Sequence, residues 1–280
     1  MDGCQPAGKN FEMKSLIFAA GLGTRLKPLT DTMPKALVRV GGQPLLEHVL
    51  RRLQAAGFDD FVINACHFSE QIVDYVEHRE DTGAHIALSI EEGQPLETGG
   101  GILAAREKIL AAPGDGFLAH NVDILSDLDF SWFLSGVRFE ALSTLLVSDR
   151  KTQRYFLFDD DMRLVGWTNL ATGEVRSPFS DLDPSRCRRY AFAGIHYISD
   201  RVFDAMTALG FSGRFSIVDF YLKAAQEYPV YGAVPEHLSL LDVGKLDSLA
   251  AAEEFVRALQ EKRLKNPAIF SPNAFATANG

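Results

Sequence analysis

The sequence predicts an α/β protein built on a covered, mainly parallel sheet. Short apolar runs rich in β-forming residues alternate with amphipathic helical patterns through the first half of the chain. This alternation favours parallel strands with helices packed on the faces of the sheet. At 280 residues with 46% hydrophobic content, the chain is long enough to bury a large core.

The first half supplies most of the predicted elements. Strands are expected at 15–18, 61–64, 86–91, 117–123 and 144–147, and helices at 45–56, 69–77, 101–110 and 128–137. The helix at 45–56 has the clearest pattern, because Leu45, Leu46, Val49, Leu50 and Leu53 fall on one face.

The pattern changes from about residue 150, where strands are separated by longer polar connections. Strands are expected at 155–158, 164–167, 190–198 and 238–243, and a helix capped by Ser216 is expected between the last two. A helix from near Lys245 closes the fold. We expect a mixed second half on the same sheet, an extended or disordered segment at 1–13 and a loose tail at 265–280.

Charge and composition exclude several classes of protein. The formal net charge of -9 argues against a surface for nucleic acid or anionic membrane, because both require clustered cations. No apolar run is long enough for a membrane span, and the first residues do not resemble a signal peptide. Three cysteines without CxxC spacing indicate neither a disulfide framework nor a zinc ribbon, so a cytoplasmic location is expected.

A glycine turn directly follows the first predicted strand. Gly21 and Gly23 begin a dinucleotide pattern, but Leu26 occupies the position of its third glycine and also breaks the Walker phosphate loop. A turn of small residues remains, followed by Arg25 and Lys35, and it suits polyphosphate because backbone N–H groups and cations both bind phosphate oxygens. The structural alternative is that the two glycines only provide positive φ angles in a loop.

The residues around this turn resemble the signature of the sugar-phosphate nucleotidyltransferases. The matching stretch is Ala19-Ala20-Gly21-Leu22-Gly23-Thr24-Arg25-Leu26-Lys27-Pro28-Leu29-Thr30, followed by Pro34-Lys35. The resemblance implies a Rossmann-like three-layer α/β/α sandwich with a mixed, mainly parallel central sheet. It also implies that a nucleoside triphosphate, UTP or GTP, and a sugar 1-phosphate react to give a nucleotide sugar and pyrophosphate.

The resemblance assigns roles to the residues of this first motif. Arg25 and Lys35 are the expected catalytic residues, because Arg25 would stabilise charge on the leaving group and Lys35 would align the α-phosphate or the sugar phosphate. The expected nucleotide-binding residues here are Ala19, Ala20, Gly21, Gly23, Thr24 and Arg25.

A second motif, Pro-Leu-Glu-Thr-Gly-Gly-Gly-Ile at 95–102, follows the strand expected at 86–91. It is similar to segments of bacterial N-acetylmuramate 1-phosphate uridylyltransferases and mannose 1-phosphate guanylyltransferases. The resemblance assigns contacts with the base and ribose to Leu96, Glu97, Thr98, Gly99 and Gly100. The alternative is a flexible loop before a helix, with the triple glycine exposing backbone donors.

Two carboxylates are expected to bind Mg²⁺. Asp123 follows an apolar run, and side chains at the carboxyl ends of strands bind ligands in open α/β sheets. The resemblance implies Asp242, in Leu240-Leu241-Asp242-Val243-Gly244, as the second ligand. Val122 stands where the family has Gly, and Leu240 stands where it has an aromatic residue. Asp127 and Asp129 are expected to cap the next helix.

The sugar-binding side carries weaker signals. Gly194 lies in a stretch that resembles the family strand that leaves room for the sugar, and Asn169 and Glu174 fall where the family places sugar contacts. Gly194 alternatively marks a strand bulge. We expect one domain over 14–264, with a nucleotide-binding part at about 14–150 and a sugar-binding part at about 151–240.

The expected partners are a nucleoside triphosphate and a sugar 1-phosphate, with no nucleic acid or membrane, in a monomer or homo-oligomer. Two other functions stay open. One is a catalytically silent relative that binds nucleotide sugars, suggested by Val122, although Arg25, Lys35 and both aspartates are present. The other is an oxidoreductase that uses the glycine turn, which Leu26 disfavours.

Overall fold

The structure is a computed structural model that describes residues 13–80, 82–111, 114–138 and 140–265. Apart from Met13, the predicted segment at 1–13 lies outside the described residues, and so does the predicted tail from 266 onward. None of the helices in the described part is long and apolar enough to cross a membrane.

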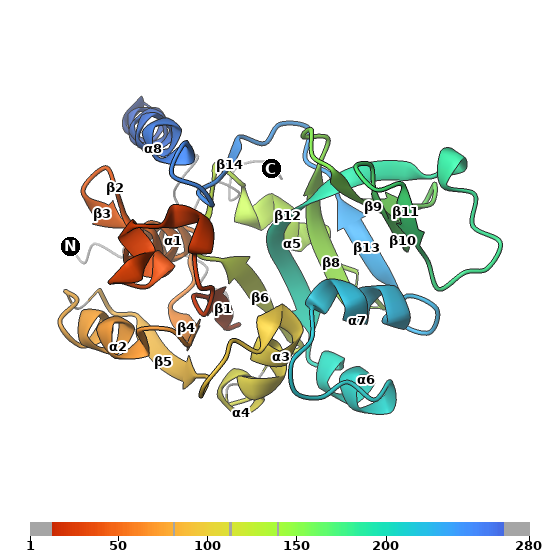
Figure 1. Ribbon diagram of the computed structural model, residues 1–280, viewed down its shortest axis with the longest axis horizontal. Helices are drawn as coiled ribbons and strands as arrows, with labels where there is room; N and C mark the ends of the chain where they lie inside the picture. The colour runs from red at the N-terminus through yellow and green to blue at the C-terminus, as the bar shows by residue number, and fades with distance from the viewer. Residues whose placement is uncertain (1–12, 81, 112–113, 139, 266–280) are drawn as a thin grey trace, which may run out of the picture.

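Four parallel strands form one end of the main sheet (Figure 1). β1 (Ser15–Phe18) lies between β4 (Asp60–Ala65) and β6 (Gly116–Asn121), and β5 (His85–Ile90) pairs with the outer side of β4. All four match predicted strands within a few residues. Their carboxyl ends therefore meet at one edge, where an open α/β sheet binds its ligands.

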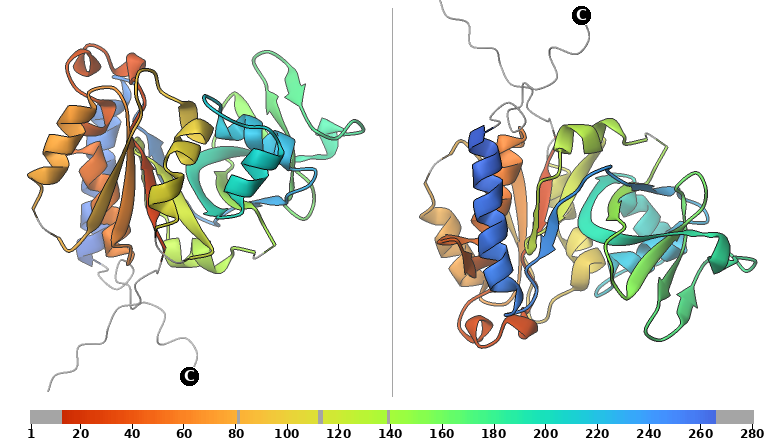
Figure 2. Two further views of the ribbon diagram at one scale, coloured as in Figure 1. Left: turned by 90° about the horizontal axis from the view of Figure 1, so that it is seen from below. Right: turned by 90° about the horizontal axis from the view of Figure 1, so that it is seen from above.

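Side chains of these strands alternate between two cores, one on each face of the sheet. Ile17 and Phe61 belong to the core under α1 (Leu45–Ala55), α2 (Ser69–Glu77) and α8 (Ser248–Lys265). Leu16 and Val62 belong to the core under α3 (Glu97–Ala104) and α4 (Arg106–Ile109). Figure 2 shows these two sets of helices on opposite sides of the strands. The predicted three-layer sandwich with a mixed sheet is confirmed.

A long antiparallel strand joins the two halves of the chain. β12 (Arg188–Ser199) pairs with β6, with β8 (Ser143–Ser148) and, through its first residues, with β9 (Arg154–Phe158). β10 (Leu164–Asn169) and β11 (Glu174–Arg176) extend the sheet beyond β9, and β13 (Val230–Ala233) pairs with β8 in parallel. The second half is therefore mixed and shares the sheet of the first half, as predicted.

Short elements complete the structure around the carboxyl edge. β7 (Ile124–Ser126) pairs with β14 (Leu240–Asp242), and β2 (Arg39–Val40) pairs with β3 (Gln43–Pro44). Three single-turn 3-10 helices, η1 (Thr24–Leu26), η2 (Leu29–Asp31) and η3 (Lys35–Leu37), follow β1. Another, η4 (Pro184–Arg186), precedes β12. The remaining helices are α5 (Phe130–Ser135), α6 (Val202–Ala208) and α7 (Ile217–Ala224).

One predicted helix start was wrong, and of the two aspartates predicted to cap the next helix one was right. The helix predicted at 101–110 begins at Glu97 and breaks into α3 and α4, with its triple glycine buried inside α3 and not exposed before it. Asp129 caps α5 by accepting from the backbone N–H of Ser131 and Trp132. Asp127 does not cap this helix, because its carboxylate accepts from Ser239 N at 2.7 Å and so ties the segment before β14 to β7.

Candidate active site

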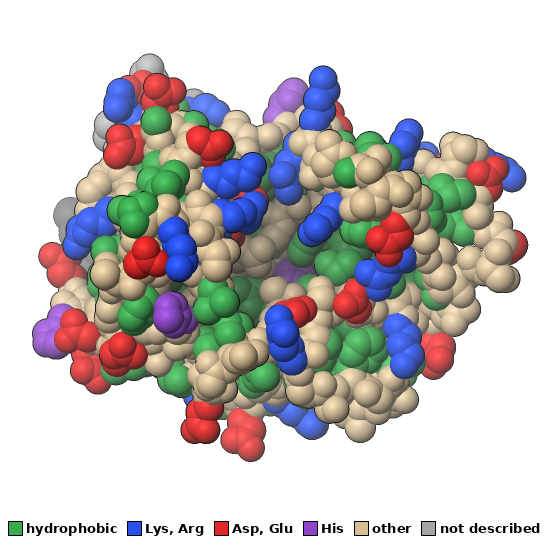
Figure 3. Space-filling view, in the orientation of Figure 1, with side chains coloured by type: hydrophobic (Ala, Val, Ile, Leu, Met, Phe, Trp, Pro, Cys, Tyr) green, Lys and Arg blue, Asp and Glu red, His purple; other side chains and the backbone are tan. Residues whose placement is uncertain are grey.

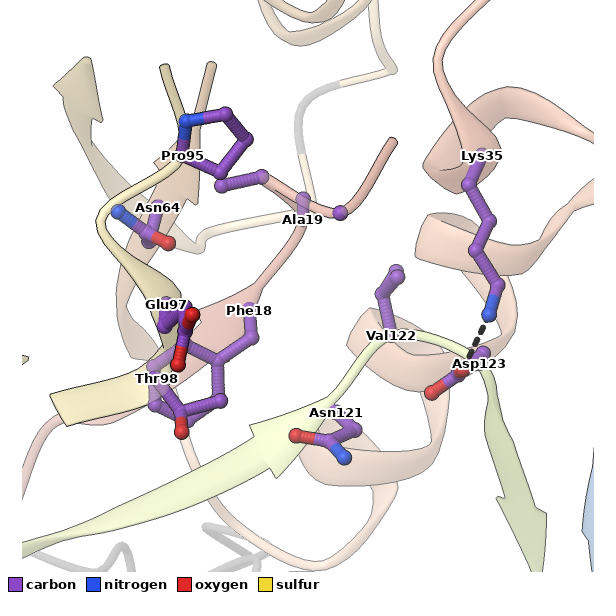
Figure 4. A pocket seen from close by; sticks show the side chains of 12 residues that line it. Phe18, Ala19, Lys35, Asn64, Pro95, Glu97, Thr98, Asn121, Val122 and Asp123 are labelled. Carbon is purple, nitrogen blue, oxygen red and sulfur yellow. Dashed lines mark hydrogen bonds and ion pairs between the residues drawn. The ribbon is translucent and has the colours of Figure 1, made fainter. Parts of the chain in front are cut away.

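Two adjoining pockets lie at the carboxyl edge of the parallel strands. The first, of about 200 Å³ (Figure 4), is lined by Phe18, Ala19, Ala20, Gly21, Lys35, Asn64, Pro95, Glu97, Thr98, Asn121, Val122 and Asp123. The second, of about 600 Å³, is lined by Gly21, Leu22, Gly23, Thr24, Arg25, Lys35, Gly93, Gln94, Pro95, Glu97, Arg214 and Gly244. All four predicted motifs thus border the two pockets. The fourth, around Asp242, does so through Gly244.

The two glycines of the turn serve different purposes. Gly23 has a φ of +61°, and a Cβ there would lie 2.9 Å from Thr30 Cγ2 and 3.1 Å from Lys35 Cβ. Thr30 Oγ1 also donates to Gly23 O at 2.8 Å, which fixes the turn. A Cβ at Gly21 would meet nothing within 4 Å. The structural explanation therefore accounts for Gly23, whereas Gly21 leaves open space that adjoins both pockets.

Lys35 and Asp123 contact each other in the lining of the first pocket. Lys35 begins η3, and its Nζ donates to Asp123 Oδ2 (Figure 4). Both side chains are mostly buried, with exposures of 10% for Lys35 and 19% for Asp123. The pair brings a cation of the first motif to the carboxylate at the end of β6, 88 residues later in the chain.

Asp242 lies beside Asp123 because β14 pairs with β7. In this ladder Asp242 is opposite Ile124, and Val243 N donates to Asp123 O at 2.8 Å. Asp242 Oδ1 is buried and has no hydrogen-bond partner in the described part of the chain. Burial raises the pKa of Asp242, and the Asp123 charge raises it further, while Lys35, Arg25 and Arg150 oppose the shift.

Arg25 approaches this carboxylate pair through Gly244. A Cβ at Gly244 would lie 2.7 Å from Asp242 Oδ1 and 2.8 Å from Arg25 Nη2. The space that a side chain would need is therefore taken by the guanidinium and the carboxylate. Gly244 is therefore required for steric reasons. Its position between Asp242 and Arg25 brings the fourth motif into contact with the first.

The second motif, at 95–102, is held by contacts that the sequence did not indicate. Leu96 N donates to Glu91 Oε2 at 2.7 Å. Gly99 N and Gly100 N both donate to Phe215 O, at 3.0 and 3.2 Å. These backbone donors are therefore engaged within the protein, and Leu96, Gly99 and Gly100 do not line either pocket. Glu97 and Thr98 do line a pocket, and Glu97 has a φ of +62°.

Sequence reasoning missed several residues that line these pockets. Asn64 is the residue before the last of β4, beside β1, and its Nδ2 donates to the buried Glu91 carboxylate at 2.8 Å. Asn121 ends β6 and lines the first pocket. Both could have been found, because polar residues at the carboxyl ends of adjacent parallel strands meet at one edge. Arg214, which pairs with Glu97 Oε1 at 3.0 Å, lies in a loop that carried no such signal.

Only one of the three predicted sugar-side residues lies near the pockets. Gly194 has a φ of +74° where the β12 register shifts, and a Cβ there would lie 2.7 Å from Asn121 Nδ2. It is a bulge that also borders the site. Asn169 and Glu174 face each other at the end of the β10–β11 hairpin, and Asn169 Oδ1 accepts from Ala171 N at 3.0 Å. The structure does not bring these two side chains to the pockets.

Cations gather around the hollow although the protein is acidic overall. Figure 3 shows Lys and Arg side chains on both sides of the central hollow. The described residues contain no group of three or more His, Cys, Asp or Glu side chains that could hold a metal ion. Any metal here would therefore rest on the two carboxylates alone and on oxygen atoms of a ligand. Val122, which replaces the family Gly, is buried and lines the first pocket.

Comparisons with known proteins agree with this geometry. The N-acetylmuramate alpha-1-phosphate uridylyltransferase of Caulobacter vibrioides is 32% identical over 246 residues, which are 85% of this chain and 95% of the relative. A probable mannose-1-phosphate guanylyltransferase of Arabidopsis thaliana is 36% identical over 118 residues, 41% of this chain and 32% of the relative. The crystal structure of a putative glucose-1-phosphate thymidylyltransferase from Bacillus anthracis has the same fold, with a TM-score of 0.71, 18% identity, and coverage of 88% of this chain and 95% of that one.

A family model described as nucleotidyl transferase matches residues 14–258. The match includes all four motifs, and their side chains meet at one edge of the sheet. It leaves no support for the oxidoreductase alternative, since Leu26 is fully buried in η1 where a dinucleotide turn would need its third glycine. The chain is therefore an enzyme that belongs to the nucleotidyl transferase family.

Proposed function

We propose that the protein joins UTP to N-acetylmuramate 1-phosphate, giving UDP-N-acetylmuramate and pyrophosphate. The observation that carries nucleotidyl transfer is the convergence of Arg25, Lys35, Asp123 and Asp242 on adjoining pockets. The choice of base and sugar rests on the uridylyltransferase relative, whose match covers 95% of its length. The guanylyltransferase match of 118 residues is too short to cover both the nucleotide-binding and the sugar-binding parts.

The arrangement suits in-line attack of a sugar phosphate on the α-phosphorus. The first pocket would take the base and ribose, beside Asn64, Glu97 and Thr98. The second, with Arg25 and the open side of Gly21, would take the β- and γ-phosphates. Lys35 borders both pockets, where it can hold the α-phosphate in line. Arg25 would stabilise the charge that develops on the departing pyrophosphate.

Asp123 and Asp242 fit a divalent cation of the Mg²⁺ type. Asp123 directly precedes β7 and Asp242 ends the paired strand β14, and one oxygen of Asp242 is buried without a partner in the described part of the chain. Hard cations prefer carboxylate oxygens and share the rest of their shell with phosphates and water. When bound, the metal would neutralise phosphate charge. The protein's own part is to hold the two carboxylates together, with Lys35 restraining Asp123.

A matrix assay tests the proposal. Each of four nucleoside triphosphates is incubated with a panel of sugar 1-phosphates and Mg²⁺, and pyrophosphate release is measured. We expect the highest kcat/KM for UTP with N-acetylmuramate 1-phosphate, no release in excess chelator, and at least about a hundredfold loss in Asp123→Ala. A preference for GTP or for another sugar would overturn the substrate assignment but leave nucleotidyl transfer intact. No release with any pair would overturn both.

A further inference from the structure

Arg150 lies where the nucleotide-binding part passes into the sugar-binding part. It follows β8 by two residues, in the connection that leads to β9. At this level β12, the neighbour of β8, carries a bulge, since its register with β8 shifts between Phe192 and His196. The bulge contains Gly194, so Arg150 lies beside the strand segment that borders the first pocket.

One hydrogen bond fixes the guanidinium to this bulge. Arg150 Nη2 donates to Phe192 O at 3.0 Å, two residues before Gly194. Gly194 in turn packs against Asn121 and Ile124, the residues on either side of Val122 and Asp123. This series of contacts connects Arg150 to the bulge whose glycine lies against Asn121, a residue that lines the first pocket.

The rest of the guanidinium has no partner within the described residues. Its Nε is buried without a hydrogen bond, and no carboxylate forms an ion pair with it. Arg79, another shielded arginine, does have a carboxylate partner, because it pairs with Glu47. A charged group with unused donors in a shielded position is well suited to an anionic ligand.

Arg150 also differs from the two cations of the first motif, because it lies beside the β12 bulge. Lys35 is already paired with Asp123, and Arg25 lines the second pocket with the glycine turn. An acceptor phosphate that enters from the sugar-binding side needs a further cation, and Arg150 is placed to supply it.

We propose that Arg150 binds the phosphate group of the sugar 1-phosphate and directs one of its oxygens toward the α-phosphorus. This inference rests on the proposed function. A planar guanidinium with one Nη2 N–H engaged by Phe192 O can still offer its other Nη2 N–H and the parallel N–H beside it to two oxygens of a phosphate monoester, which fixes both distance and orientation. Arg150 neither gains nor loses a proton, and its contribution is binding and alignment of the nucleophile.

Three variants of the full-length enzyme test the inference. Arg150→Gln should raise the KM for the sugar 1-phosphate more than about tenfold and leave the KM for the nucleoside triphosphate within about twofold. Arg150→Lys should recover part of this loss, because it keeps the charge but lacks the fork. Arg163→Gln is the matched control, since Arg163 is also bonded to a backbone carbonyl, Ala225 O at 2.8 Å, but in the sugar-binding part away from the pockets.

The KM values and the turnover show whether the role of Arg150, a general structural effect or the proposed function is at fault. Equal rises in both KM values, or an unchanged KM for the sugar 1-phosphate in Arg150→Gln, would overturn the role of Arg150 alone. N-acetylmuramate 1-phosphate carries both a carboxylate and a phosphate, whereas N-acetylglucosamine 1-phosphate carries only the phosphate. Similar rises in KM for both substrates in Arg150→Gln support phosphate binding. A rise confined to the muramate substrate points to its carboxylate and overturns the inference. Absence of turnover in the wild-type enzyme would instead refute the proposed function.

Discussion

Gly244 illustrates how a single residue without a side chain can organise charged groups. A methyl group at this position would lie within 2.8 Å of both Asp242 Oδ1 and Arg25 Nη2, which are the ends of flexible side chains. Gly244→Ala should therefore displace the charges without disrupting the fold. We expect kcat to fall by about one to two orders of magnitude, because small misplacements of catalytic groups have effects of this size. Steady-state kinetics and thermal unfolding measure the two effects.

Gly136→Ala provides the control for this substitution. A Cβ at Gly136 would make only ordinary contacts, the nearest at 3.6 Å, and the residue follows α5 away from the pockets. It should leave kcat unchanged. An unchanged kcat in Gly244→Ala as well would show that Arg25 and Asp242 tolerate the methyl group.

Asp242 should be needed for catalysis although its ionised carboxylate lowers the stability of the folded protein. Burial and the Asp123 charge raise its pKa, so the ionised carboxylate at neutral pH is less favourable in the folded state than in the unfolded state. Asp242→Asn should therefore raise the melting temperature at neutral pH in chelator while abolishing pyrophosphate release. The gain should shrink as the pH falls toward the ordinary value of 3.8, because the wild-type carboxyl then gains its proton. A lower melting temperature at neutral pH would contradict this account.

At the scale of elements, periodicity predicted the central strands and helices, whereas contacts between distant segments could not be predicted. The α1 pattern is strong enough to give a boundary within one residue, Leu45–Ala55 against 45–56. The start of α3 depends instead on Phe215 O, which accepts from Gly99 N and Gly100 N more than a hundred residues earlier in the chain. No local pattern of Gly99–Gly101 carries that information. The same limit applies to β13, whose pairing with β8 is likewise not a local property.

Glu47 connects α1 to α2 in one layer, and its substitution should cost these helices much of their stability. It is buried on α1 and accepts from Arg51, Tyr75 and Arg79, the last two from α2 and the segment after it. Burial raises its pKa, but these hydrogen bonds outweigh burial and lower it to about 2. Glu47→Ala should reduce the free energy of unfolding by about 3–5 kcal/mol, because it leaves the buried Arg79 unpaired. Urea denaturation measures the loss.

The pH dependence of Glu47 has the opposite sign to that of Asp242. Its stabilising contribution should be complete above the ordinary value of 4.5 and should disappear as the pH falls toward about 2. The difference in stability between wild type and Glu47→Ala should narrow over that interval. Asp74→Ala, at a side chain that is 75% exposed on α2, should cost little at any pH. A similar loss of stability in Glu47→Ala and Asp74→Ala would argue against a stabilising role of the hydrogen bonds of Glu47.

At the scale of the whole molecule, the site depends on segments from both ends of the chain. The motifs around Arg25, Asp123 and Asp242 could be predicted to meet because their order along the chain resembles that of the family. The contributions of Glu91 and Arg214 became visible only in three dimensions, where the parallel edge and the loop before α7 come together. Asn169 and Glu174 were placed by order along the chain alone, and their β10–β11 hairpin extends away from the pockets (Figure 1).

The nucleotide-binding and sugar-binding parts should differ in function but fold together as one unit. β12 pairs with β6 and β8 of the first part and with β9 of the second, and α8 covers the α1 face with Ala252 and Val256. A fragment of residues 13–150 would expose the edge of β6 and the apolar surface beneath α8. We expect it to lack a cooperative thermal transition by circular dichroism, whereas the full chain unfolds in one transition that coincides by far-ultraviolet and near-ultraviolet signals. A fragment that unfolds cooperatively and binds UTP would instead make the first part an independent domain.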